Sequence, residues 1–321
     1  MKSKKILFIA AAMVFLVLIA AVSFSGCLGG QNQNRGHVHG PDCNHGDPNA
    51  AYDALDNESV HQILNGSKIL VAVSVIPQAE FVEKVGGDRV IAISMIPPGA
   101  GHNYDPSPRQ LEDLSKASLY IKLDAGEPFE NNYMNTFTQL NRNMTVVSAS
   151  KGITLIRSGN ATDPHIWTSP KCAMVMVENT YEGLAQIDPA NATYYRDNAD
   201  AYLEELRELD NDLTEMLSTL PTRYFMVYHP AWGYLSRDYN LTQIAIEVDG
   251  KEPSPRAIVQ YIDLAKKNNI TVIFVQEQVS VSGARAVAEG IGGDVYVIDP
   301  LAKNYVENTR HVGVVLSEKM S

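Results

Sequence analysis

Three histidines and one aspartate follow apolar runs that are expected to form β-strands. His102, His165, His229 and Asp299 recur at similar intervals along the chain, each directly or shortly after such a run. One loop histidine alone is more often a surface or packing residue than a ligand, and an aspartate before proline is more often a turn former. In open α/β sheets, however, ligands bind outside the carboxyl ends of the strands. We therefore expect the four side chains to meet in one cleft.

Three imidazoles and one carboxylate are a donor set that suits a transition metal. Neutral imidazole nitrogens and a single carboxylate oxygen favour tetrahedral Zn²⁺, whereas exchange of a histidine for a second carboxylate would favour Mn²⁺. Zinc is therefore the expected ligand and manganese the alternative. Because each imidazole must be unprotonated to bind, metal affinity should fall as the pH drops through the histidine range.

Two sets of apolar, β-branched runs alternate with amphipathic segments. The expected strands are 69–76, 89–96, 119–123 and 144–149 in the first set, and 224–228, 241–248, 271–275 and 295–298 in the second. Strands that alternate with helices indicate a parallel sheet. The fold class is therefore α/β, with two lobes that each hold a four-stranded, mostly parallel sheet flanked by helices.

The segment between the two sets predicts a long helix. Leucines recur there at intervals of three and four, Asp188 is a candidate N-cap, Pro189 suits the first helical position and Pro221 ends the pattern. About 30 residues of helix span about 45 Å. We therefore expect a first lobe at 66–187, a rigid linking helix at 188–220 and a second lobe at 221–321.

Five motifs resemble those of a known family, the metal-binding solute-binding lipoproteins of ABC importers (the ZnuA/TroA type). The resemblance extends from about Lys68 to the C-terminus. The matching segments are Pro-Pro-Gly-x-x-His-x-Tyr-x-Pro-x-Pro at 97–108, Asp-Pro-His-x-Trp at 163–167, His-x-Ala-Trp-Gly-Tyr at 229–234, Gly-x-Glu-Pro-Ser at 250–254 and Asp-Pro-Leu at 299–301.

The resemblance implies a function and a ligand set. His102, His165, His229 and Asp299 would be the metal ligands, and the protein would capture zinc or manganese between its lobes. It would deliver the metal to the permease and ATPase of an ABC importer, act as a monomer and have no enzymatic activity. The chain departs from the family at Gly101, where proline or glutamate is frequent, and its histidine-rich stretch precedes the first lobe.

Two other functions use the same residues. A secreted zinc hydrolase would bind zinc through the three histidines and keep water in the fourth position. Glu277 is its candidate general base, although the same residue could be an acid beside the metal or a helix cap. His-Glu-x-x-His and related protease motifs are absent from the sequence. The other alternative is a surface adhesin that a metal merely stabilises.

The N-terminus predicts export. Lysines precede an apolar run at 6–22, and small residues lead to Cys27. This is the layout of a signal peptide at 1–26, after which Cys27 would carry a lipid. A retained transmembrane anchor is the alternative, but about 17 apolar residues are at the short limit for spanning a bilayer. Both readings place the protein on the outer face of the cell membrane.

Residues 27–65 are expected to tether the lipid to the first lobe. The possible auxiliary metal ligands in this polar segment are His37, His39, Cys43 and His45. Dense histidine and cysteine tracts are typical of metal binding, and a merely solvated tail is the alternative. The formal net charge of -11 argues against nucleic acid as a partner.

Overall fold

The computed structural model describes residues 54–159, 161–247, 251–276 and 282–320. The signal peptide predicted at 1–26 and most of the tether predicted at 27–65 lie outside these residues. So do the individual predictions for Cys27, His37, His39, Cys43, His45 and Glu277. Within the described ranges, no helix combines the length and the hydrophobicity that a membrane span requires.

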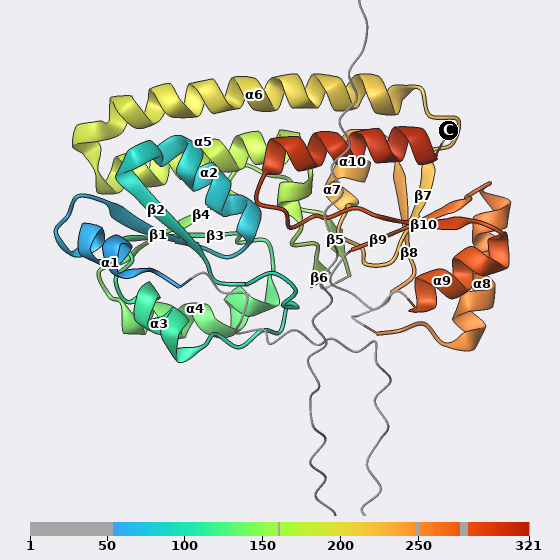
Figure 1. Ribbon diagram of the computed structural model, residues 1–321, viewed down its shortest axis with the longest axis horizontal. Coiled ribbons are helices and arrows are strands. Elements are labelled where there is room, and N and C mark those ends of the chain that lie inside the picture. Colours follow the sequence, from blue (N-terminus) through green and yellow to red (C-terminus); the bar gives the residue numbers. More distant parts are fainter. Residues whose placement is uncertain (1–53, 160, 248–250, 277–281, 321) are drawn as a thin grey trace, which may run out of the picture. The chain divides into compact units, whose positions relative to one another are not determined.

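The first lobe is built on a parallel sheet of four strands in the order β2-β1-β3-β4. Its strands are β1 (Ile69–Val73), β2 (Val90–Ser94), β3 (Leu119–Lys122) and β4 (Thr145–Ser148). Its helices are α2 (Ile76–Gly86), α3 (Pro108–Leu114), α4 (Pro128–Leu140) and α5 (Pro170–Ile187). In Figure 1, α2 and α5 lie on one side of this sheet and α3 and α4 on the other. Coverage on both faces explains why its central strands are almost continuously apolar.

The second lobe repeats the plan with a parallel sheet in the order β10-β9-β7-β8. Its strands are β7 (Tyr224–Val227), β8 (Thr242–Ala245), β9 (Val272–Val275) and β10 (Asp294–Val297). Its helices are α7 (Gly233–Asp238), α8 (Pro255–Lys267), α9 (Ser282–Ile291) and α10 (Tyr305–Lys319). The predicted fold class, two four-stranded α/β lobes, is therefore confirmed.

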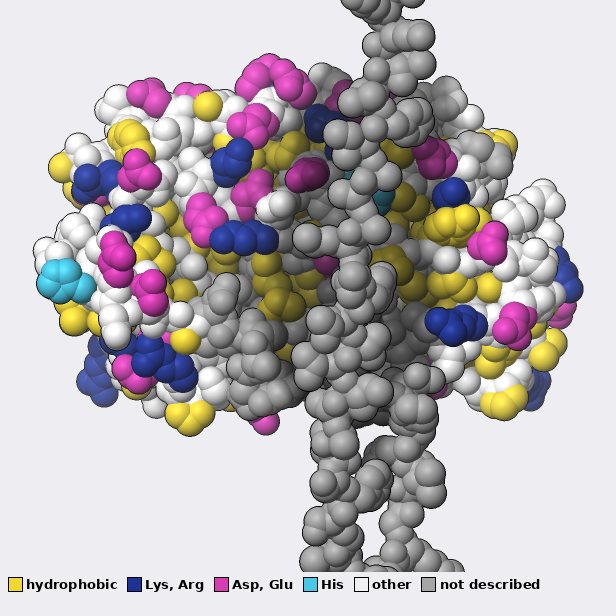
Figure 2. All heavy atoms as spheres, viewed as in Figure 1, with side chains coloured by type: hydrophobic (Ala, Val, Ile, Leu, Met, Phe, Trp, Pro, Cys, Tyr) yellow, Lys and Arg dark blue, Asp and Glu magenta, His cyan; other side chains and the backbone are white. Residues whose placement is uncertain are grey.

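A long helix runs beside both lobes. The 3-10 turn η3 (Pro189–Asn191) leads into α6 (Ala192–Ser218), which contacts α2, α5 and α10 (Figure 1). Leucines of α6 are buried against these helices, and Figure 2 shows acidic side chains along the edge where α6 runs. The predicted linking helix is confirmed. Asp188 occupies the N-cap position of η3, as predicted, and Asn191 that of α6, but neither side chain makes a capping hydrogen bond.

Several short elements were not expected from the sequence. They are α1 (Asn57–Leu64), η1 (Gly87–Arg89), η2 (Ile166–Thr168) and an antiparallel pair formed by β5 (Arg157–Ser158) and β6 (Ala161–Thr162). The strands other than β10 are also shorter than the apolar runs that predicted them. Residues beyond the paired part of a run, such as Ile96 and Ile298, stay buried in loops, so hydrophobicity continues where strand pairing has ended.

One apolar core crosses the junction of the lobes. It includes Phe81 and Tyr120 from the first lobe together with Tyr234 and Phe274 from the second. Hydrogen bonds cross the junction as well, since the Tyr234 hydroxyl donates to the Asp163 carbonyl over 2.8 Å. This packing sets how the loops that follow the strands of one lobe face those of the other.

Candidate metal centre

Three loops from the two lobes bring the predicted histidines together. His102 lies in the loop between β2 and α3, His165 immediately precedes η2, and His229 follows β7 by two residues. One potential ligand nitrogen from each ring can be chosen so that all three lie within 4.8 Å of one another. This is the arrangement expected if folding makes one metal centre from distant parts of the chain.

Two of the rings meet through their Nε2 edges, and the His102 ring lies beside both. The Nε2 atoms of His165 and His229 are 3.2 Å apart. The ring centroid of His102 lies 5.3 Å from that of His165 and 5.5 Å from that of His229. Three nitrogen lone pairs can therefore be directed at one ion.

A carboxylate holds the opposite nitrogen of every ring. The Nδ1 atom of His102 is 3.0 Å from Glu127, that of His165 is 2.7 Å from Asp163, and that of His229 is 3.2 Å from Glu247. An Nδ1–H that donates to a carboxylate fixes the tautomer in which Nε2 carries the free lone pair, and it raises the basicity of Nε2.

These carboxylates come from different parts of the fold. Glu127 is the N-cap of α4 and is completely buried, and Glu247 follows β8. Asp163 stands two residues before His165 and also accepts that residue's backbone N–H at 2.9 Å. Sequence reasoning missed all three. Only Asp163 offered a signal, its place in the Asp-Pro-His motif.

The surroundings shift the histidine pKa values in opposite directions. Burial lowers the pKa of His102, but its hydrogen bond to Glu127 and the charge of that carboxylate outweigh burial, so its pKa is raised above 6.5. Burial lowers the pKa of His165 below 6.5 despite Asp163, and the neighbouring His229 and His102 add to the decrease. His102 is therefore the ring at which a proton competes more strongly with a metal.

Gly233 allows α7 to approach Asp163 closely. A Cβ atom built on Gly233 would lie 2.3 Å from Asp163 Oδ2, much closer than any real contact. The Tyr234 hydroxyl also donates to the Asp163 carbonyl and accepts the Ile156 N–H at 3.1 Å. A helix of the second lobe therefore packs directly against the residue whose carboxylate orients a histidine of the first.

Asp299 lies just beyond β10 and is not a member of the three-histidine group. Its Oδ1 accepts the Leu301 N–H at 2.9 Å. The next two residues, Pro300 and Leu301, line the same cleft as the histidines, and the Pro300 carbonyl accepts the indole N–H of Trp167 at 2.7 Å. The structure thus places the Asp299 segment at the wall of the cleft.

The cleft beside the histidines has a volume of about 820 Å³. Its walls are largely apolar and include Val75, Ile96 and Leu301, with Tyr104 and Trp167 as aromatic members. Trp167 is buried and Tyr104 half-buried, and the Tyr104 hydroxyl donates to Gln110 at 2.6 Å. Apart from Asn103, Tyr104 and Gln276, the polar side chains of the lining are the three imidazoles and two of their carboxylates, Glu127 and Glu247. A low local dielectric strengthens the interactions among them.

A family model and a solved structure both match most of this chain. The family model described as "Zinc-uptake complex component A periplasmic" (ZnuA) matches residues 71–318. A solved structure, "Crystal structure of ZnuA", superimposes with a TM-score of 0.76 at 38% sequence identity, covering 79% of this chain and 100% of that one.

Two curated relatives are also similar over most of this chain. The high-affinity zinc uptake system protein ZnuA of Bacillus subtilis is 27% identical over 260 residues, which are 74% of this chain and 79% of the relative. The zinc-binding protein AdcA of Streptococcus pyogenes is 27% identical over 268 residues, 75% of this chain. That match covers 52% of AdcA, so this chain corresponds to about half of that longer protein.

Proposed function

Because this chain belongs to the family of zinc-uptake components named ZnuA, we propose that it captures Zn²⁺ between its lobes outside the cell and delivers it to an ABC importer. The permease and ATPase of that importer are the proposed partners, and the protein acts as a monomer. The family consists of metal-binding transport proteins and not of enzymes. Nothing in the similarities supports the hydrolase alternative.

The observation that carries this proposal is the group of three imidazoles whose Nδ1 atoms are all held by carboxylates. Such pairs favour neutral rings whose Nε2 lone pairs point toward a common centre. Zinc coordination by histidine requires this tautomer and orientation. We propose His102, His165 and His229 as three ligands. Asp299 is proposed as the fourth, because the residues that follow it line the same cleft.

The donor set favours zinc over manganese. Three nitrogen ligands and one oxygen suit a tetrahedral, borderline-soft ion, whereas Mn²⁺ prefers oxygen-rich and higher coordination. The Nδ1 hydrogen bonds add basicity to the rings and so strengthen nitrogen coordination further. Manganese is therefore expected to bind the same site more weakly.

Metal analysis of the exported protein tests the proposal. Protein purified without added metal should contain at least one zinc per chain, and calorimetry should show Zn²⁺ displacing bound Mn²⁺ but not the reverse. Zinc-loaded protein should also transfer its metal to vesicles that contain the matching permease and ATPase. Absence of stoichiometric zinc binding, or release of zinc only on unfolding, would contradict capture and delivery.

The raised pKa of His102 predicts a particular pH dependence. Below this pKa the ring holds a proton that zinc must displace, so the apparent affinity should fall about tenfold per pH unit as the pH drops through that pKa. In Glu127→Gln the charge that raises the pKa is gone and burial still lowers it. As the pH is lowered, the zinc affinity of this variant should therefore begin to fall at a lower pH than that of the unmodified protein.

Chelator competition between about pH 5.5 and about pH 8.5 brackets the ordinary histidine pKa and measures both profiles. Glu127→Gln should also bind more weakly at the alkaline end, since a neutral amide supports the ring less well than a carboxylate. If the plots of zinc affinity against pH for the two proteins differ only by a constant factor, Glu127 does not control the protonation of His102.

The N-terminal predictions complete the proposal. We propose that Cys27 carries a lipid that anchors the protein on the outer face of the membrane. The part of residues 27–65 that precedes α1 would tether the lobes to it, since α1 itself is folded. The histidines and Cys43 in that segment would be auxiliary metal ligands. Support comes from the order of charged, apolar and small residues in the sequence.

A further inference from the structure

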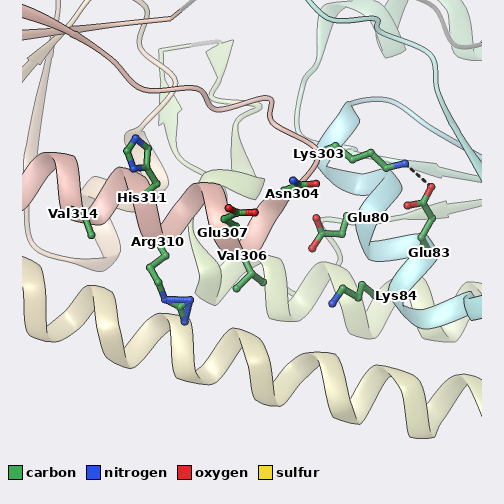
Figure 3. Close-up of a pocket in the computed structure, with 10 residues that line it drawn as sticks. All are labelled: Glu80, Glu83, Lys84, Lys303, Asn304, Val306, Glu307, Arg310, His311 and Val314. Carbon is green, nitrogen blue, oxygen red and sulfur yellow. Dashed lines mark hydrogen bonds and ion pairs between the residues drawn. The ribbon is translucent and has the colours of Figure 1, made fainter. Parts of the chain in front are cut away.

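A groove of about 690 Å³ lies between α2 and α10, next to the long helix α6. Figure 3 shows that side chains from α2 of the first lobe and from the start of α10 in the second face each other across it. Two acids of α2, Glu80 and Glu83, point toward the segment that leads into α10. These contacts join the lobes at a groove that none of the three metal-site histidines lines.

Glu80 makes two hydrogen bonds to elements outside its own helix. Its Oε2 accepts the backbone N–H of Tyr305, the first residue of α10, at 2.6 Å. Its Oε1 accepts the hydroxyl of Tyr202, which belongs to α6, at 2.8 Å. One carboxylate therefore links the first lobe, the linking helix and the second lobe.

The bond to Tyr305 supplies what α10 lacks. The first N–H groups of a helix have no partner within the helix and are usually satisfied by the N-cap side chain. Asn304 occupies the N-cap position of α10 but makes no such bond. Glu80 satisfies one of these groups instead, and its negative charge at the N-terminus also suits the helix dipole.

A second cross-lobe contact is much weaker. Lys303 and Glu83 form an ion pair of 2.9 Å, but their side chains are 55% and 40% exposed. Exposed ion pairs contribute little because water screens them and ordering the side chains costs entropy. Glu80 is thus the acid whose bond to the backbone holds the start of α10.

The start of α10 in turn holds the segment at the wall of the metal cleft. The Asn308 amide, one turn into α10, donates to the Asp299 carbonyl at 2.6 Å. On the other side, Trp167 donates to the Pro300 carbonyl at 2.7 Å, and its ring centroid is 5.3 Å from that of His165. The Asp299 segment is therefore held between α10 and the first lobe.

From these contacts we infer that Glu80 is a positioning residue for Asp299 and thereby sets how long the bound metal is retained. The inference rests on the proposed function, in which Asp299 is the fourth zinc ligand. Without the Glu80 carboxylate, the N-terminal turn of α10 loses its cap and Asn308 no longer holds the Asp299 carbonyl in place. The metal then leaves faster, although no group that touches it has changed.

The test compares two substitutions of nearly equal size. Glu80→Met keeps the packing volume and removes the acceptor, whereas Glu80→Gln keeps an oxygen for Tyr305 and a donor for Tyr202. Stopped-flow transfer of zinc to excess chelator should show dissociation roughly tenfold faster in Glu80→Met, the effect of losing one charge-assisted hydrogen bond. In Glu80→Gln, zinc should dissociate at nearly the same rate as from the unmodified protein.

Two further variants separate positioning from general destabilisation. Tyr202→Phe removes the other partner of the same carboxylate, so it should lower the melting temperature and leave the dissociation rate unchanged. In an Asp299→Ala background, Glu80→Met should add no further acceleration, because the ligand that it positions is absent. Glu80→Ala serves for the same comparison should methionine fail to pack.

The outcomes distinguish this inference from the proposed function. A protein that binds zinc stoichiometrically but whose Glu80→Met variant releases it at the original rate overturns the inference alone. The same holds if Glu80→Met accelerates release equally with and without Asp299. Failure of the unmodified protein to bind zinc would instead overturn the proposed function.

Discussion

Replacing His229 by alanine is expected to weaken zinc binding by roughly a hundredfold to a thousandfold while the lobes stay folded. A zinc site of four ligands gains about 10–16 kcal/mol in all, and about a quarter of this would be lost. His229 is the histidine that the second lobe contributes, and its Nε2 lies 3.2 Å from that of His165. His102, His165 and the proposed ligand Asp299 would remain, and these three donors would hold zinc less tightly than four.

Calorimetry with a competing chelator measures this change, and circular dichroism checks the fold. His61→Ala is the matched control, because His61 is an exposed histidine on α1. The control should bind zinc as the unmodified protein does. An affinity of His229→Ala equal to that of His61→Ala would remove the three-histidine site from the proposal.

Asp163→Asn is expected to lower zinc affinity by about 10- to 100-fold, although Asp163 does not contact the metal. Its Oδ1 is 2.7 Å from His165 Nδ1 and accepts the His165 backbone N–H. An amide of the same shape lacks the charge that makes the ring a stronger donor. Because the amide can also turn its NH₂ group toward the ring, the tautomer with a free Nε2 would lose its preference.

The same chelator competition tests this prediction against Asp88→Asn, a substitution of the same kind at an exposed position in η1. Zinc affinity should fall only in Asp163→Asn. Cobalt substituted for zinc provides a second measurement, since its visible spectrum reports changes in ligand geometry. Identical affinities and spectra for the two variants would mean that the carboxylate beside His165 has no part in binding.

Much of the architecture could be predicted from local patterns. Runs of β-branched residues such as 69–76 and 271–275 indicated the strands, since strands covered on both faces are continuously apolar. The leucines of α6 indicated a long helix through their spacing. The ends of the strands were predicted less accurately, because side chains remain buried past the last paired residue, as at Ile96 and Ile298.

The three histidines could be found because each lies near the end of a strand or in a motif shared with a known family. Their carboxylate partners could not. Glu127 pairs with a histidine 25 residues earlier, and Glu247 with one 18 residues earlier, and both pairs depend on which loops the sheet order places side by side. Glutamates are common in this chain, and nothing in their local sequence distinguishes these two.

By itself, then, the sequence determined the strands, the helices and the histidines, because hydrophobic periodicity and residue type are local properties. Tertiary structure alone decided how those histidines are oriented and how the Asp299 segment is held. Glu80 caps a helix 225 residues later in the chain, and Gly233 lets α7 approach Asp163. Such contacts arise only when two lobes pack together, since hydrogen-bond geometry depends on positions in space that spacing along a chain does not specify.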